Sequence, residues 1–250
     1  MQQRLLSSRQ ADFAVEAYLL GQVDFDACLA LQQWLVYEAS GRADGQITLL
    51  VCEHPPLVTI GRLGSRAHVH MTPAELTSRR LEVRWVNRGG GCLLHAPGQL
   101  AIYPVVPLED HELSVGQYLE RLHTGLLRTL ADLRIEGHRL PRRHGIWGRT
   151  GQLVAIGAAV KSWVTYHGAF INVAPPMHVS RFIHADPEGG TAMTSLVVER
   201  QQPVKMASVR ASLVRHLAEA LGCSRFHLYT GHPLLGRASK ARHELAARTH

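Results

Sequence analysis

The stretch RGGGCLLHAPGQLAIYPVVPL (residues 88–108) places three consecutive glycines between an arginine and an apolar run. Glycine lets the backbone approach a ligand closely, and a guanidinium can orient a carbonyl or a carboxylate. His95 is the first imidazole beyond the glycines, and imidazoles change charge near neutral pH. The stretch therefore predicts the floor of a binding site, with a strand that ends in a glycine-rich turn as the alternative.

The segments around this stretch predict an α+β domain that has a mixed β-sheet and flanking helices. Apolar residues recur at roughly helical spacing over residues 11–40, and the clearest predicted helices are 25–39, 115–133 and 209–221. Short apolar runs predict strands at 47–52, 57–60, 81–86 and 100–106. A hairpin is predicted from 153–160 and 166–173, with its turn near Lys161 and Ser162. Grouped strands with intervening helices, and no βαβαβ rhythm, are typical of this class.

Length and composition favour one globular domain. The chain has 250 residues, of which 46% are hydrophobic, and this suits a single domain over 1–231 followed by a basic tail over 232–250. No stretch has the length and apolarity of a membrane span, and the beginning MQQRLLSSRQADF lacks the apolar core of a secretory signal. We therefore expect a cytoplasmic protein that does not enter membranes.

A formal charge of +7 and a pI near 9.6 favour acidic partners. Arginines cluster at 139–149 and in the tail from 237, but neither cluster is interleaved with the aromatic residues of a base-stacking surface. Nucleic acid is therefore the minor alternative among acidic partners.

The cysteines and histidines predict no metal site and no cofactor. Cys28, Cys52, Cys92 and Cys223 lie far apart without a Cys-x-x-Cys pair, which argues against a disulfide framework and against a zinc knuckle. The sixteen histidines are dispersed, and none has the HExxH spacing. We expect reduced thiols and histidines that serve the surface or the packing.

Five motifs in order resemble the lipoate-biosynthesis octanoyltransferases, the lipoate-protein ligase B type. They are EHPPLVTIGRLGSRAHV (53–69), RGGGCLLHAPGQLAIYPVVPL (88–108), VAIGAAV (154–160), YHGAFINV (166–173) and TSL (194–196). The resemblance covers residues 17–221 and implies the catalytic-domain fold of biotin and lipoate protein ligases. It also implies transfer of an octanoyl or lipoyl group from acyl carrier protein to a lysine of a lipoyl domain.

The resemblance implies that three segments line an acyl pocket. They are Arg88, Gly89, Gly90, Gly91, Cys92, Leu93, Leu94 and His95; Ala155, Ile156 and Gly157; and Gly168, Ala169 and Phe170. An octanoyl chain needs an apolar slot, because each buried CH₂ contributes roughly 0.8 kcal/mol. Glycine turns can also aim N–H groups at a developing oxyanion. His95 and His167 lie beside these segments, and each is either a hydrogen-bonding group for the thioester or a packing histidine.

The usual catalytic pair of the family is replaced in this chain. The resemblance implies a nucleophilic cysteine ahead of Thr-Ser-Leu, and a lysine ahead of Ala-Ile-Gly that lowers the pKa of this cysteine. Counting back from Thr194 puts Asp186 at the cysteine position, and counting back from Gly157 puts Gln152 at the lysine position. Asp186 is a poor acyl acceptor because a mixed anhydride lies uphill of a thioester, so it is a turn residue or a general base.

Two other residues are weighed as substitutes for this pair. Cys92 lies inside the glycine segment, but strand alternation sends Cys92 and His95 to opposite faces, which favours a packing thiol. Lys161 is an odd number of residues from Gln152, so it is expected on the other face or in the hairpin turn.

Three hypotheses follow from these observations. The first is an acyltransferase, by direct attack of the target lysine in a ternary complex or through a rearranged nucleophile. An adenylating ligase is a variant of the first, without an evident nucleotide-binding lysine. The second is a degenerate relative that binds acyl groups or carrier domains without turnover, and the third is a basic nucleic-acid-binding module. The family resemblance favours the first.

Overall fold

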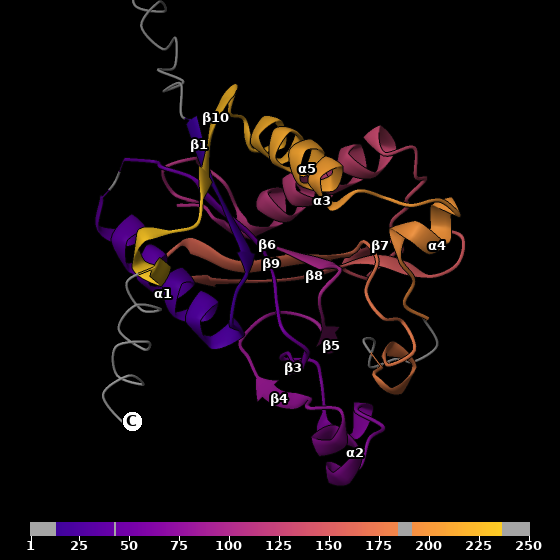
Figure 1. Ribbon diagram of the computed structural model, residues 1–250. Helices are drawn as coiled ribbons and strands as arrows, with labels where there is room; N and C mark the ends of the chain where they lie inside the picture. Colours follow the sequence, from indigo (N-terminus) through magenta and orange to yellow (C-terminus); the bar gives the residue numbers. More distant parts are fainter. Residues whose placement is uncertain (1–13, 43, 185–191, 237–250) are drawn as a thin grey trace, which may run out of the picture.

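The computed structural model describes residues 14–42, 44–184 and 192–236 (Figure 1). Its strands are β1 (Ala14–Gln22), β2 (Thr48–Glu53), β3 (Leu57–Ile60), β4 (Glu82–Trp85), β5 (Cys92–His95), β6 (Gln99–Val105), β7 (Gly145–Trp147), β8 (Gln152–Lys161), β9 (Val164–Asn172) and β10 (Arg225–Thr230). Its helices are α1 (Phe25–Arg42), α2 (Pro73–Ser78), α3 (Val115–Asp132), α4 (Leu196–Arg200) and α5 (Met206–Leu221), with 3₁₀ turns η1 (Arg66–His68) and η2 (Ser180–Phe182). No helix in this part of the chain is long and apolar enough to cross a membrane.

The strands form two sheets. The larger sheet has the order β10-β1-β2-β6-β9-β8-β7, in which β1 runs parallel to both of its neighbours and the remaining pairs are antiparallel. The smaller sheet has the order β4-β3-β5 and also mixes a parallel pair with an antiparallel pair. The predicted α+β class with a mixed sheet and flanking helices is confirmed.

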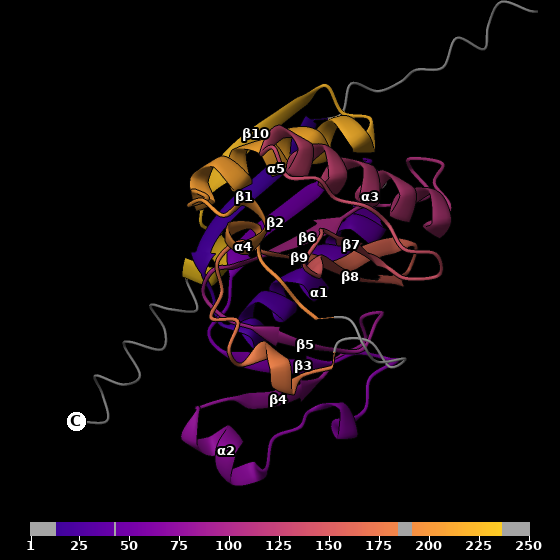
Figure 2. The ribbon, with the colours of Figure 1, turned by 90° about the vertical axis from the view of Figure 1, so that its right-hand side faces the viewer.

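Helices cover both faces of the large sheet. Figure 1 shows the sheet nearly edge-on, with α3 and α5 above it and α1 below it, and Figure 2 shows the small sheet on the lower side. The upper face packs Leu122 of α3 and Leu213 of α5 against strand residues such as Ile102. The lower face forms a second apolar cluster, called here the α1-side cluster, which consists of Cys28, Leu31, Leu50, Cys52, Leu93, Ala101, Tyr103, Ala155 and Phe170. Because α1, the large sheet and β5 all contribute to it, this cluster lies where the predicted pocket segments meet.

Local sequence signals explain where the helices begin and end. Ser114 and Gln117 form a capping box at the start of α3, each accepting a hydrogen bond from the other's backbone N–H, at 3.2 Å and 2.8 Å. Gly222 takes a left-handed φ of +92° and ends α5, a conformation that favours glycine. The three predicted helices are confirmed, with α1 extending to Arg42 and α5 beginning at Met206.

The sequence prediction differs from the structure in two details. The helical spacing over 11–40 predicts a helix only at 25–39 and assigns no element to residues 14–22, which form strand β1 because pairing with β2 and β10 satisfies their backbone groups. The β8–β9 hairpin is confirmed, but its turn is Ser162–Trp163, both with positive φ, while Lys161 still pairs with Val164. The single domain over 1–231 with a tail over 232–250 stays a prediction, since residues beyond 236 lie outside the described part.

Candidate functional site

The glycine segment is held between the small sheet and strand β8. The Gly89 N–H donates to the Ala158 carbonyl at 3.1 Å, while the N–H groups of Gly61 and Leu63 donate to the carbonyls of Gly91 and Gly90 at 3.0 and 3.1 Å. In the β8–β9 ladder, Ala155 pairs with Phe170 and Gly157 pairs with Gly168. The structure therefore brings the three predicted segments, 88–95, 155–157 and 168–170, into one place.

Arg88 is a fully buried cation at the centre of this arrangement. Its guanidinium donates to the Thr59 hydroxyl from Nε (3.2 Å) and Nη2 (2.8 Å), to the Thr59 carbonyl from Nη2 (3.0 Å), and to the Gly89 carbonyl from Nη1 (2.9 Å). Among the described residues, no ion pair joins it to a carboxylate. Burial lowers the pKa of Arg88 to about 10, so the group is still charged at neutral pH.

Two glycines make the space that the Arg88 side chain fills. A Cβ on Gly61 would lie 2.8 Å from Nη1 of Arg88, and a Cβ on Gly157 would lie 2.5 Å from the Gly89 carbonyl and 3.2 Å from Cδ of Arg88. Gly90 serves a different purpose, because its φ of +78° is a left-handed conformation that turns the segment. Within the described residues, the N–H groups of Gly90 and Gly91 donate no hydrogen bond to a backbone carbonyl. Such successive unpaired amides around a left-handed residue can bind an anionic oxygen.

A directed chain of hydrogen bonds leads away from Arg88. Because Arg88 only donates, the Thr59 hydroxyl accepts from it and gives its own hydrogen to Nε2 of His95 at 2.9 Å. Nδ1 of His95 then donates to Oε1 of Gln99 at 2.9 Å, and Nε2 of Gln99 donates to Oδ1 of Asn172 and to the Leu94 carbonyl, both at 2.9 Å. Burial, followed by the charges of His54 and Arg88, lowers the pKa of His95 well below its ordinary value. His95 is thus a neutral imidazole with both nitrogens occupied, which favours the packing interpretation.

His167 is the opposite case. It is buried, its φ is +53°, and its Nδ1 finds no hydrogen-bond partner among the described residues. Its backbone N–H donates to Oε1 of the buried Gln32 side chain at 2.8 Å, which holds this unusual conformation. Burial, with smaller effects from Arg88 and Arg62, lowers the pKa of His167 to about 3. Of these two histidines, His167 is the one with a ring nitrogen left unpaired within the described residues, while both ring nitrogens of His95 are hydrogen-bonded.

Strand alternation divides the predicted apolar residues between faces. Leu93, Ala155 and Phe170 belong to the α1-side cluster. Cys92 and Leu94 face the core of the small sheet, while Ile156 and Ala169 face α3 and α5. The first three side chains can line an acyl slot, and the other four contribute only backbone to this face.

Gln152 begins β8 beside the segment that leads into the Thr-Ser-Leu motif. Its N–H donates to the Ala192 carbonyl at 2.9 Å, and its carbonyl accepts from the Thr194 N–H at 3.0 Å. Met193, between these two, packs against the α1-side cluster. The Gln152 amide donates to the Val154 carbonyl at 3.3 Å and carries no charge, so it cannot replace a lysine electrostatically. Asp186 lies outside the described residues.

None of the chain's four cysteines is exposed, and Cys92 is a packing thiol. Cys92 lies in the core of the small sheet, where its Sγ donates to the Ser65 carbonyl at 3.4 Å, and burial raises the pKa of this thiol. His95 points to the other face, towards Thr59 and Gln99. The prediction that Cys92 and His95 face opposite sides is confirmed, and Cys92 cannot be activated by His95.

Sequence reasoning missed four polar residues that build the site. Thr59, Gln99 and Asn172 lie inside the quoted motifs, and a search for hydrogen-bonding residues within those motifs would have found them. Gln32 lies on α1, 135 residues from its partner His167, and no local pattern reveals that contact.

The fold and this glycine-arginine site define a catalytic domain of the lipoate and biotin ligase type. The T. acidophilum protein Ta0514, solved with bound lipoic acid, superposes with a TM-score of 0.71 at 14% identity, covering 91% of this chain and 94% of that one. Lipoate-protein ligase A bound with ATP superposes with a TM-score of 0.67 at 16% identity, covering 90% of this chain and 93% of that one. At these identities the likeness establishes the fold.

The chain belongs to the lipoyl protein ligase A/B catalytic domain family, whose model matches residues 24–218. The octanoyltransferase of Syntrophotalea carbinolica is 40% identical over 205 residues, covering 81% of this chain and 92% of the relative. The octanoyltransferase of Chloroflexus aggregans is 38% identical over 205 residues, covering 80% of this chain and 91% of the relative. The resemblance carried by the five motifs is confirmed.

Proposed function

We propose that this protein is an octanoyltransferase that moves an octanoyl group from acyl carrier protein to a lysine of a lipoyl domain. The relatives that match this chain over most of its length are named octanoyltransferase. The observation that carries the proposal is the buried Arg88 and its glycine turn beside the α1-side cluster, which offers a polar end and an apolar end to one ligand. An acyl thioester has the same two ends.

Each end of the site has a role in this proposal. Leu93, Ala155 and Phe170 receive the acyl chain, while the free amides of Gly90 and Gly91 stabilise the oxyanion that develops on the thioester carbonyl. Arg88 keeps the turn rigid and adds positive potential near those amides. A pKa of about 3 makes His167 a weak general base. Its role in this proposal is therefore to hydrogen-bond the acyl thioester or the incoming amine rather than to remove a proton.

Direct transfer fits the side chains better than an acyl-enzyme. Gln152 supplies no cation, and burial raises the pKa of Cys52 and Cys92, which makes both thiols poor nucleophiles. In direct transfer the neutral lysine amine attacks the thioester carbon, so that a C–N bond forms and the C–S bond breaks. The carrier thiolate leaves and takes up the proton that the amine loses.

A transfer assay with octanoyl carrier protein and an apo lipoyl domain tests the proposal. We expect the lipoyl domain to gain the mass of one octanoyl group over several turnovers, with no hydroxylamine-labile adduct on the enzyme. Binding of the carrier without any transfer would instead support a degenerate relative and would overturn the proposed activity. Omitting the lipoyl domain is the control for hydrolysis of the thioester.

We further propose that both partners are acidic, because the chain carries a formal charge of +7. Attraction between opposite charges weakens with ionic strength, since the Debye length falls from about 10 Å at 0.1 M salt to about 3 Å at 1 M. Association with the carrier, followed by surface plasmon resonance, should therefore weaken steadily as salt rises. Salt-independent association would contradict this part of the proposal.

A further inference from the structure

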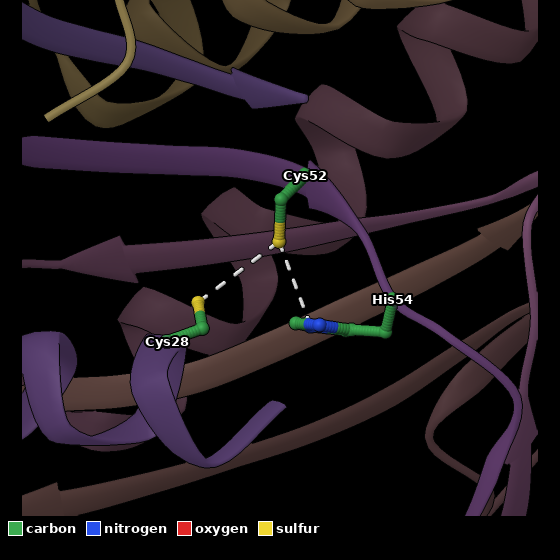
Figure 3. Close-up of side chains that lie close together, drawn as sticks. All are labelled: Cys28, Cys52 and His54. Atoms are coloured by element: carbon green, nitrogen blue, oxygen red, sulfur yellow. Dashed lines mark hydrogen bonds between the residues drawn. The ribbon is translucent and has the colours of Figure 1, made fainter. Parts of the chain in front are cut away.

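Two cysteines and a histidine from separate segments meet beneath the candidate site. Cys28 comes from α1, Cys52 from β2 and His54 from the loop after β2, and Figure 3 shows the two sulfurs and the imidazole directed towards one another. The Sγ atoms of Cys28 and Cys52 are 4.0 Å apart, and Sγ of Cys52 is 3.5 Å from Nε2 of His54. All three donor atoms lie within 4.8 Å of one another, and all three residues are buried.

These separations are close to the edges of a metal coordination tetrahedron. With Zn–S near 2.3 Å and Zn–N near 2.0–2.1 Å, tetrahedral angles place two sulfurs about 3.8 Å apart and a sulfur and a nitrogen about 3.6 Å apart. The two edges at Cys52, observed at 4.0 and 3.5 Å, need only small adjustments, and the third, between Cys28 and His54, lies within 4.8 Å and closes by a rotation of side chains. We propose that Cys28, Cys52 and His54 bind a thiophilic metal ion, zinc(II), inside the α1-side cluster.

Neighbouring groups already orient the three ligands as a metal requires. Nδ1 of His54 lies 2.7 Å from the Val23 carbonyl, and because a carbonyl only accepts, Nδ1 carries the hydrogen and Nε2 keeps its lone pair. Nε2 of Gln32 donates to Sγ of Cys28 at 3.8 Å, a contact that suits a thiolate. A partner on the second imidazole nitrogen and hydrogen bonds to the ligands are typical of metal sites.

Tyr103 and charge balance complete the argument. The Tyr103 hydroxyl donates to Nε2 of His54 at 2.6 Å, so it must turn away when the metal takes that lone pair, and its oxygen can then fill the fourth position. Binding releases one proton from each thiol, and two thiolates with one zinc(II) ion and a neutral imidazole carry no net charge. A neutral centre suits apolar surroundings, where an isolated thiolate is costly.

Such a centre would tie α1 to the sheet directly behind the candidate site. Gln32 contacts both Cys28 and the backbone of His167, so a metal at Cys28 would also fix the left-handed backbone conformation of His167 in β9. The three residues are separated by 24 and 2 positions along the chain, which is why no Cys-x-x-Cys or HExxH spacing revealed them.

Metal content and cobalt spectra test this proposal without reference to activity. The full chain, purified under reducing conditions and reconstituted with zinc, should hold about one ion per chain by mass spectrometry of the metal. Cobalt(II) in its place should give thiolate-to-cobalt charge-transfer absorption. Cys28→Ser and Cys52→Ser should each lose the ion and the absorption, while Cys223→Ser, which removes a buried thiol from the α3 and α5 core, should keep both.

A second variant guards against loss of fold. Cys92→Ser combined with Cys223→Ser leaves only Cys28 and Cys52, and it should still bind one ion and gain thermal stability from zinc. Absence of bound metal in the reconstituted wild type and in this double variant would overturn the proposal. So would retention of the ion by the Cys28→Ser, Cys52→Ser double variant, or a Cys28–Cys52 disulfide in the protein purified under reducing conditions.

Discussion

The candidate site has an acyl side, which would bind the acyl group, and a transfer side, which would move it. The two sides differ in how completely they keep the residues that the family resemblance implies. On the acyl side, Arg88, Thr59 and His95 form a buried and complete chain of hydrogen bonds. On the transfer side, the family resemblance puts Gln152 at the lysine position, and its uncharged side-chain amide donates to the carbonyl of Val154 in its own strand. The acyl side depends on packing across two sheets, whereas the usual transfer chemistry depends on two side chains. We therefore expect recognition of the acyl group to persist with Gln152 and Asp186 at those two positions.

The largest expected effect comes from restoring the transfer side. Asp186→Cys combined with Gln152→Lys gives back a thiol and the cation that lowers its pKa. Because the acyl side is intact, we expect the octanoyl carrier to load this variant with a hydroxylamine-labile adduct, detected by intact mass. The wild type should show none.

Single variants separate the two substitutions. Asp186→Cys alone should load much more slowly, since a thiol without a nearby cation is mostly protonated at neutral pH. Gln152→Lys alone should not load. An adduct on the wild-type chain, at Cys92 for example, would show that the contrast between the two sides is wrong.

The next effect comes from damaging the acyl side at Gly157. In Gly157→Ala the new Cβ would lie 2.5 Å from the Gly89 carbonyl and 3.2 Å from Cδ of Arg88, so backbone has to move. Overpacking of this kind costs about 1–3 kcal/mol, and we expect the variant to lose its thermal stabilisation by an octanoyl ligand as well. Denaturant unfolding and thermal shift measurements check both outcomes.

Gly41→Ala is the matched control, because its Cβ would meet no atom within 4 Å and it lies in helix α1. Alanine is the better helix former by about 1 kcal/mol, so this variant should be as stable as the wild type or slightly more stable. Equal behaviour of the two variants would remove the argument that Gly157 makes space for Arg88.

Much of the fold could be predicted from local pattern, and the misses have physical causes. Helices α3 and α5 carry apolar stripes with caps at Ser114 and Gly222, signals that lie within a few residues of the helix ends. Strand β1 carries no such signal, and only its pairing with β2 and β10 decides that residues 14–22 are extended.

The candidate site shows the same division. Motif order located Arg88, the glycines and Phe170, because these residues lie in contiguous segments. Strand alternation could predict from the sequence that Cys92 and His95 face opposite sides. The contact between Gln32 and His167 and the meeting of Cys28 with Cys52 depend on how α1 packs on the sheet, and no spacing along the chain carries that information.

A smaller effect should follow from interrupting, at Thr59, the chain of hydrogen bonds that leads from Arg88 to His95. Thr59→Val keeps the shape but removes the hydroxyl that accepts from Arg88 and donates to His95. Hydrogen bonds to charged groups contribute about 1.5–3 kcal/mol. In the variant, Nη2 of Arg88 keeps its hydrogen bond to the backbone carbonyl of residue 59, but Nε has no other partner within the described residues, so we expect a loss of stability in that range. Thr129→Val is the matched control, since its buried hydroxyl donates only to the Gly125 carbonyl within α3 and should cost about 1 kcal/mol. Equal losses of unfolding free energy in the two variants, measured with denaturant, would mean that the contact with Arg88 contributes no more than an ordinary hydrogen bond to a helix carbonyl.

The smallest predicted change is in the slope of the free energy of unfolding against pH, and it concerns the unpaired imidazole of His167. The pKa of this group is about 3 in the folded chain against an ordinary value of 6.5, so the unfolded chain binds the proton first as the pH falls. The stability that His167 contributes is therefore complete above pH 6.5 and declines by about 1.4 kcal/mol per pH unit towards pH 3. His167→Asn keeps a side chain that tolerates the φ of +53° and removes this titration, so its free energy of unfolding should fall less steeply than that of the wild type. Measurement at pH 8, where His167 is neutral in both states, isolates the packing difference between the two proteins. Parallel pH profiles below 6.5 would show that His167 is not held neutral, and the acyl side would then contain a proton-accepting group after all.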